Sequence, residues 1–142
     1  MNLIAVMQHS LLLLQLTLVQ LGVFHLVGPV PAELGVQHGA LAPCPSPAHC
    51  ARVNWNVDNP AAALQTLTAA VQALPRTTVV EQSHGYLHAT ASSRLFGFVD
   101  DLELYADTDN GVVQARSVSR LGDSDLGVNA RRLAGLETVL KG

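Results

Sequence analysis

The stretch from Arg94 to Asn129 reads RLFGFVDDLELYADTDNGVVQARSVSRLGDSDLGVN and decides the fold of this chain. It holds three of the eight basic residues and seven of the eleven acidic ones, so more than half of the charged side chains lie here. The pair Asn110-Gly111 tolerates positive φ at both central positions of a tight turn. The flanking segments FVDDLELYAD and VVQARSVSR are therefore predicted to form an antiparallel hairpin.

Strand alternation assigns the side chains of this hairpin to two faces. A turn at Asn110-Gly111 places Asp101 opposite Arg120, whereas a turn at 109–110 places Glu103 opposite Arg116. In both registers the same residues share the polar face, namely Asp101, Glu103, Tyr105, Gln114, Arg116 and Arg120. The apolar face holds Phe98, Leu102, Leu104, Val113 and Ala115. We therefore expect one polar face and one core face.

The neighbouring segments complete an α+β domain over residues 58–142. Apolar residues at spacings of three and four predict a helix over 60–74, capped by Asp58 or Asn59. The period then changes to two in TTVVEQ and YLHATAS, which predicts a first hairpin with His88 on the polar side. The segment ARRLAGLETVLK predicts a last helix capped by Asn129. The predicted architecture has two layers, with a helix, a four-stranded antiparallel meander and a helix in chain order.

Residues 1–32 are predicted to be a signal or membrane-anchor segment. They carry no formally charged side chain, and residues 11–30 are long and apolar enough to enter a bilayer as a helix. No Lys or Arg stands near the start, which is atypical of a cleaved signal peptide. A buried core helix is the alternative. We expect membrane association through residues 11–30.

Residues 33–57 are predicted to be a Pro-rich linker that holds both cysteines, Cys44 and Cys50. Their close spacing beside an apolar N-terminal segment indicates a disulfide in an oxidising compartment. Free thiols are one alternative. A metal site with His49 or His38 is another, although no second cysteine pair completes a tetrahedral zinc set.

Composition and motifs argue against two classes of function. The net charge of −3 and pI near 6.0 show no basic excess, so nucleic acid is not an expected partner. His88, Ser92 and an acid such as Asp101 can be drawn as a catalytic triad, but no sequence signature of a nucleophile accompanies them. We predict no catalytic residue, metal or cofactor, and the sequence favours a non-catalytic role without settling it.

The polar face has two interpretations. It is either a surface for a ligand or partner, or a solvated sheet face whose cross-strand ion pairs contribute only about 0.2–1 kcal/mol each. Asp100 breaks the pattern because alternation turns it inward. A buried carboxylate needs a partner, and Arg94 is the nearest cation in the sequence.

Several segments resemble the family called domain of unknown function 1499. They are Arg94–Asp101, Arg116–Asn129, the strand Tyr86–Thr90 and the Cys44-Pro45 pair, within a region from about Pro43 to the C-terminus. The chain departs from the family pattern at 48–52, around the second cysteine. Members are small bacterial or plastid proteins, often exported or membrane-associated, so the resemblance implies a location in the periplasm or the thylakoid lumen.

These observations predict an exported or membrane-tethered domain that acts as a non-catalytic binding or assembly module at a membrane surface. A membrane protein or a small anionic ligand is the expected partner. The alternatives are a small-molecule sensor or enzyme that uses the polar sheet face, and a purely structural charge network. The candidate residues, which include those of the family pattern, are His88, Arg94, Asp100, Asp101, Glu103, Arg116, Arg120, Ser124, Asp125 and Asn129.

Overall fold

The computed structural model of this chain describes residues 27–142. The predicted apolar N-terminal helix, and with it most of the predicted signal or anchor segment, lies outside the described residues. Between positions 27 and 142, no helix has the length and apolar character needed to cross a membrane.

A five-stranded antiparallel sheet forms the centre of the fold, in the order β3-β7-β6-β5-β4. Its strands are β3 (Cys50–Asn56), β4 (Thr77–Ser83), β5 (Tyr86–Ser92), β6 (Val99–Asp107) and β7 (Val112–Ser119). The structure confirms the α+β class and the predicted meander of four strands, which are β4 to β7. It adds β3, which lies within the segment predicted to be a linker.

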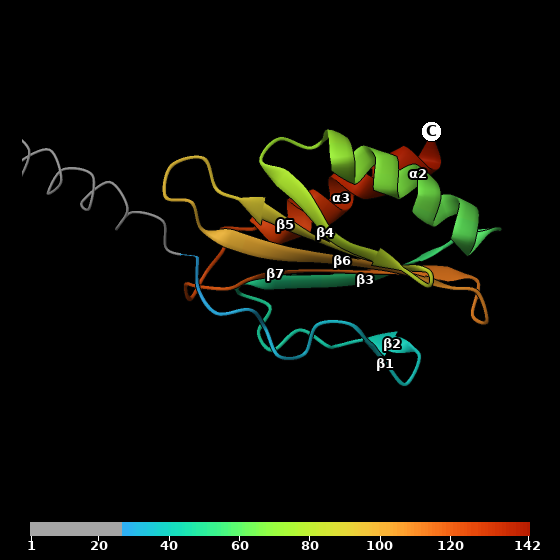
Figure 1. The fold of residues 1–142 in the computed structure, drawn as a ribbon, viewed down its shortest axis with the longest axis horizontal. Helices are drawn as coiled ribbons and strands as arrows, with labels where there is room; N and C mark the ends of the chain where they lie inside the picture. Colours follow the sequence, from blue (N-terminus) through green and yellow to red (C-terminus); the bar gives the residue numbers. More distant parts are fainter. Residues whose placement is uncertain (1–26) are drawn as a thin grey trace, which may run out of the picture.

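Two helices cover one face of the sheet, α2 (Pro60–Ala73) and α3 (Val128–Lys141) (Figure 1). Asn59 caps α2 as predicted, since its side chain accepts a hydrogen bond from the backbone N–H of Ala62 at 3.0 Å. The predicted apolar stripes pack inward, and Leu67 and Val71 of α2 are fully buried against the sheet. The core therefore lies between the helices and the apolar face of the sheet.

The predicted cap of the last helix is wrong. The cap residue of α3 is Gly127, and Asn129 lies inside the first turn. The carboxylate of Asp125 instead accepts the backbone N–H groups of Gly127 at 2.7 Å and of Asn129 at 3.3 Å. The side chain of Asn129 is free for the tertiary contacts described below.

The opposite face of the sheet is covered by an irregular N-terminal segment. It contains a small hairpin of β1 (Val36–Gln37) and β2 (Ala40–Leu41), which lies below the sheet in Figure 1. Backbone N–H groups of this segment reach the sheet directly, from Gly35 to Glu103 at 2.7 Å and from Leu41 to Gln114 at 3.0 Å. We call residues 27–49 the cover segment.

The hairpin of β6 and β7 adopts the second of the two predicted registers. Glu103 lies opposite Arg116, and the last pair is Asp107 with Val112. The intervening loop, residues 108–111, is closed by the carboxylate of Asp107, which accepts from the backbone and the side chain of Asn110 at 3.2 and 2.8 Å. The assignment of residues to faces is the same as in the first register.

Candidate functional site

Most of the polar face of the sheet is buried beneath the cover segment. Asp101, Glu103 and Arg116 are all fully excluded from solvent. The structure therefore corrects the interpretation of this face as a solvated surface. Charges in such an environment need close partners, because desolvation of an unpaired ion costs several kcal/mol.

Arg116 of β7 connects the sheet to the cover segment. Its Nη1 donates to Glu103 at 2.9 Å, and its Nη2 donates to Glu33 at 2.8 Å. A backbone hydrogen bond and the bond from Arg116 hold the pKa of Glu33 below its usual value. The second oxygen of Glu103 accepts from the hydroxyl of Tyr86 at 2.8 Å, and burial raises the pKa of that phenol, which stays protonated.

Asp101 forms a second group with Arg120 and His88. Arg120 donates to both carboxylate oxygens, from Nε at 2.8 Å and from Nη2 at 2.9 Å. Nε2 of His88 lies 2.8 Å from Oδ1. Burial alone would raise the pKa of Asp101, but the hydrogen bonds from Arg120 and His88 outweigh it and hold that pKa below 3.8.

This arrangement places a proton on Nε2 of His88. An ionised carboxylate can only accept hydrogen bonds, so Nε2 of the imidazole carries the proton that it donates to Asp101. In the neutral imidazole, Nδ1 is then left with a lone pair. No hydrogen bond joins Nδ1 to any other side chain among residues 27–142, so this nitrogen is available to a ligand.

Asp100 points to the helical side of the sheet, as strand alternation predicts, but its partner is not Arg94. Its carboxylate accepts from Nη2 of Arg132 in α3 at 2.8 Å. Arg94 is exposed in the loop between β5 and β6. The predicted pairing with Arg94 is wrong because α3 packs on the sheet and brings Arg132, which is 32 residues from Asp100, to the carboxylate.

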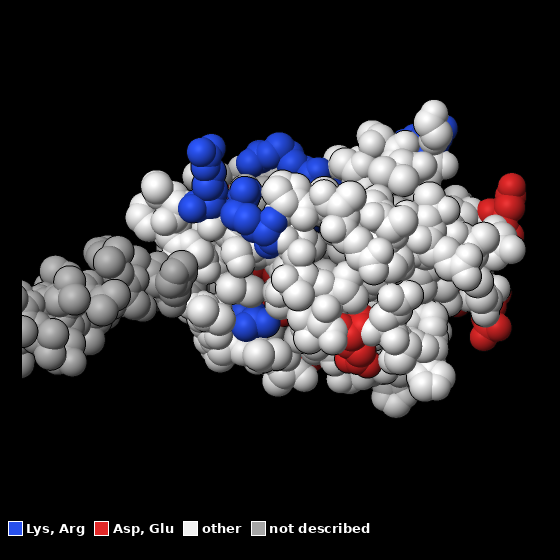
Figure 2. Space-filling view, turned by 45° about the horizontal axis from the view of Figure 1, so that its top comes forward, with Lys and Arg blue, Asp and Glu red and all other residues white. Residues whose placement is uncertain are grey.

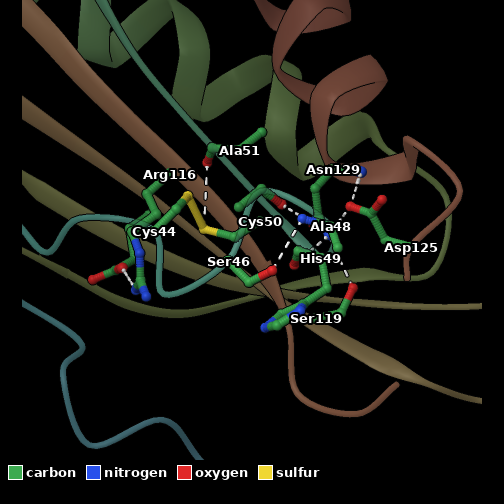
Figure 3. Close-up of a disulfide and its surroundings, with 12 residues drawn as sticks. Cys44, Ser46, Ala48, His49, Cys50, Ala51, Arg116, Ser119, Asp125 and Asn129 are labelled. Carbon is green, nitrogen blue, oxygen red and sulfur yellow. Dashed lines mark hydrogen bonds and ion pairs between the residues drawn. A yellow bond between two sulfur atoms is a disulfide. The ribbon is translucent and has the colours of Figure 1, made fainter. Parts of the chain in front are cut away.

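Asn129 joins three elements at the same end of the sheet. Its amide oxygen accepts from Ser117 at 2.6 Å and from Arg132 at 2.8 Å, while its amide nitrogen donates to Ser119 at 2.9 Å and to the backbone of His49 at 3.2 Å. Figure 3 shows Asn129 with His49, Ser119 and Asp125, close to the start of β3. These contacts give Asn129 a role in packing α3 on the sheet.

Cys44 and Cys50 form the predicted disulfide, with 5.5 Å between their Cα atoms. In Figure 3 the bridge and Arg116 lie on the same side of the sheet. The bridge therefore fastens the end of the cover segment to β3, beside the Arg116 group. Between positions 27 and 142, His, Cys, Asp and Glu side chains form no group of three or more that could hold a metal ion.

Ser124 lies apart from both charge groups. It is exposed, and its hydroxyl accepts only a local hydrogen bond from the backbone N–H of Leu126 at 3.3 Å. Of the ten candidate residues, the structure thus brings His88, Asp101 and Arg120 into one group and Glu103 and Arg116 into another. Asp100, Asp125 and Asn129 lie near the start of α3, whereas Arg94 and Ser124 are exposed in loops.

A groove of about 630 Å³ opens between the cover segment and strands β4 to β6. One wall is apolar and comes from the cover segment, with Val30, Leu34 and Val36. The floor and the other wall are formed by Val80, Glu81, Ser83, His84, Tyr86, His88, Thr90, Tyr105 and Arg120. Sequence reasoning placed His88 and Thr90 on this face but missed the apolar wall, because the cover segment has no periodic pattern.

The structure defines a small α+β domain. The cover segment, fastened by a disulfide, lies over the polar face of the sheet and leaves a groove beside β5. Residues 38–140 match the family described as protein of unknown function (DUF1499), and the chain belongs to that family. The match confirms the resemblance noted in the sequence. Neither a curated protein nor a solved structure matches the chain.

Proposed function

We propose that this domain is a non-catalytic binding module whose ligand lies in the groove between the cover segment and β5. The observation that carries this proposal is the placement of His88. It is held by Asp101 on the groove floor, and its Nδ1 is left without a protein partner among the described residues. A concave, mainly apolar site with a few oriented polar groups is the usual form of a small-molecule site.

The charges around the floor favour a neutral ligand. Arg116 and Arg120 are each already paired with a buried carboxylate. Glu81 on the rim adds a negative charge. An anion would have to compete with Asp101 or Glu103 for these guanidinium groups. The ligand that fits best has an apolar body and one hydrogen-bond donor that reaches Nδ1 of His88.

A triad with Ser92 gains no support from the geometry. Ser92 stands four residues from His88 along β5, and its backbone groups bond to Arg76. Within residues 27–142, no side-chain hydroxyl or thiol is hydrogen-bonded to the imidazole. A nucleophile next to the base is what acyl transfer requires, so we base the proposal on binding.

The Arg116 group has a structural role in this proposal. Arg116 and Glu103 are fully buried, so no ligand reaches them without displacing the cover segment. We infer that they, with Glu33, fix the apolar wall of the groove against its floor. The structural charge network is thus the support of the site rather than a competing function.

Export of the protein is also part of the proposal. The disulfide between Cys44 and Cys50 supports it, because such bonds persist in oxidising compartments and are rare in the cytosol. The uncharged residues 1–32 support it as well. A membrane anchor at this position would hold the groove close to a bilayer, where apolar ligands partition.

The proposal is tested by titration with N-phenyl-1-naphthylamine, a neutral apolar fluorescent probe with one N–H donor. The full chain should bind it saturably, and Thr90→Phe, which fills the groove floor, should weaken binding by about tenfold, equivalent to ~1.4 kcal/mol. Thr66→Phe is the matched control, since Thr66 lines a different hollow, formed by β3, α2 and α3. Equal affinities for the two variants would refute the proposal.

A further inference from the structure

Large apolar side chains are exposed on two loops at one end of the domain. Leu95 and Phe96, in the loop from β5 to β6, are 80% and 49% exposed, and Leu126, in the loop from β7 to α3, is 83% exposed. The two loops share this end because Ser92 pairs with Val99 and Asp100 pairs with Ser119. Exposed large apolar side chains that gather at one end of a domain mark an interaction surface, whereas single exposed ones are ordinary.

Arginines surround these loops. Arg76, Arg94 and Arg131 are exposed, and none is paired with a carboxylate within residues 27–142. Arg76 and Arg131, with Arg132, line a crevice of about 310 Å³ that also contains Leu74 and Val128. Arg76 uses Nε for the carbonyl of Ser92, and Arg131 uses Nη1 for that of Leu126, so both keep further donors.

On the face shown in Figure 2, charge is distributed unevenly along the length of the described domain. Figure 2 shows Lys and Arg gathered towards this end, whereas Asp and Glu are seen mostly towards the other. The exposed carboxylate among the loops of this end is Asp123. Asp125 is partly buried and accepts three hydrogen bonds from Gly127 and Asn129. Within residues 27–142, these loops and their surroundings therefore present three cations without a carboxylate partner and one exposed anion.

The N-terminal segment joins the domain at the same end. Gly28 lies so close to Leu121, in the loop from β7 to α3, that a Cβ on the glycine would be 2.7 Å from its Cγ. Residues 1–32 carry no charged side chain. If they associate with a bilayer, the chain that leaves them enters the domain beside these loops.

From these observations we propose that this end of the domain is a membrane-contact surface for an anionic lipid bilayer. Leu95, Phe96 and Leu126 enter the region between headgroups and acyl chains, and Arg76, Arg94 and Arg131 bind lipid phosphates. This combination of apolar tips and surrounding cations is how peripheral proteins bind anionic membranes. The surface is separate from the groove, and the inference does not depend on the ligand proposed there.

The test follows the fluorescence of Phe96→Trp in the full chain with phospholipid vesicles. Vesicles of phosphatidylcholine and phosphatidylglycerol in equal amounts should shift its emission to the blue, and acyl-brominated lipids should quench it. Val139→Trp is the control, because Val139 is exposed at the far end of α3. The native Trp55 is buried and is present in both variants.

The electrostatic part is tested by adding Arg76→Gln and Arg131→Gln to the Phe96→Trp chain. Each change should reduce the partition of the loop into anionic vesicles about fivefold, from ~1 kcal/mol per charge, and should leave phosphatidylcholine vesicles unaffected. Lys141→Gln, at the other end, should have no effect. The inference is overturned if the Phe96→Trp emission does not change when the protein sediments with vesicles, or if both tryptophans are quenched equally.

Discussion

Arg116 and Glu103 lie opposite each other on β7 and β6, and they form an ion pair of 2.9 Å although neither side chain is exposed to solvent. The pair is bounded on one side by Tyr86 and on the other by Glu33 of the cover segment. Nη1 and Nη2 of Arg116 bond to Glu103 in the sheet and to Glu33 in the cover segment, so the two parts depend on each other for the pairing of this buried charge.

Removal of one partner should therefore be strongly destabilising. Arg116→Met should lower the free energy of unfolding by about 3–5 kcal/mol, because Glu103 remains buried with an unpaired charge. The double variant Arg116→Met/Glu103→Leu removes both charges and should regain much of that loss. Urea unfolding measures both values, and a single variant as stable as the wild type would contradict the buried pair.

Asp100 and Arg94 give a second, matched pair of predictions. Asp100→Asn should lower the free energy of unfolding by about 1–3 kcal/mol, because Arg132 then loses a carboxylate in a mostly buried position. Arg94→Ala should change it by no more than about 0.5 kcal/mol, since the side chain is exposed. Thermal unfolding of both variants checks this. Equal losses of stability in the two variants would contradict the prediction, because they would show that the exposed Arg94 contributes as much to stability as Asp100.

The disulfide should stabilise the domain modestly. The bridge closes a short loop between Cys44 and Cys50, and chain entropy predicts a contribution of about 2 kcal/mol. The oxidised protein should therefore melt at a higher temperature than the reduced protein. The Cys44→Ser/Cys50→Ser variant is the control, and its melting temperature should not respond to reductant. An unchanged melting temperature of the wild type after full reduction would contradict the fastening role.

Acid should weaken the Asp101 group in a predictable direction. The pKa of Asp101 is lower in the folded protein than its unfolded value of 3.8, so this group stabilises the fold above that pH. The contribution is lost as the pH falls from about 4 through the folded pKa. In Asp101→Asn, the free energy of unfolding should therefore fall less steeply between pH 5 and pH 2 than in the wild type. Urea unfolding at each pH measures this. The same pH dependence in both proteins would contradict the stabilising role of Asp101.

The sequence predicts the strands of the meander and their faces because the side-chain period of a strand is two. That rule places Asp101, Glu103 and Arg116 together under either turn, and the structure agrees. It does not predict the burial of this face. The cover segment folds over the face through single contacts such as that of Gly35 with Glu103, which leave no periodic pattern in the sequence.

The strand β3 could have been predicted, since Ala51, Val53 and Trp55 alternate towards the helices. Its position directly after the prolines, with Cys50 as its first residue, favoured the interpretation as a linker. The partner of Asp100 could not have been predicted, because it depends on how α3 packs on the sheet. The groove follows from how the cover segment folds over β4 to β6, so the site as a whole could not be derived from the sequence.

NMR of the protein with bound N-phenyl-1-naphthylamine shows whether the groove beside His88 binds an apolar ligand. Intermolecular nuclear Overhauser effects should connect the probe to the methyl groups of Val36 and Thr90, which lie on opposite sides of the groove. The imidazole signals of His88 should shift in the same titration. Contacts confined to Ala62 and Val139, in the hollow formed by β3, α2 and α3, would contradict the account.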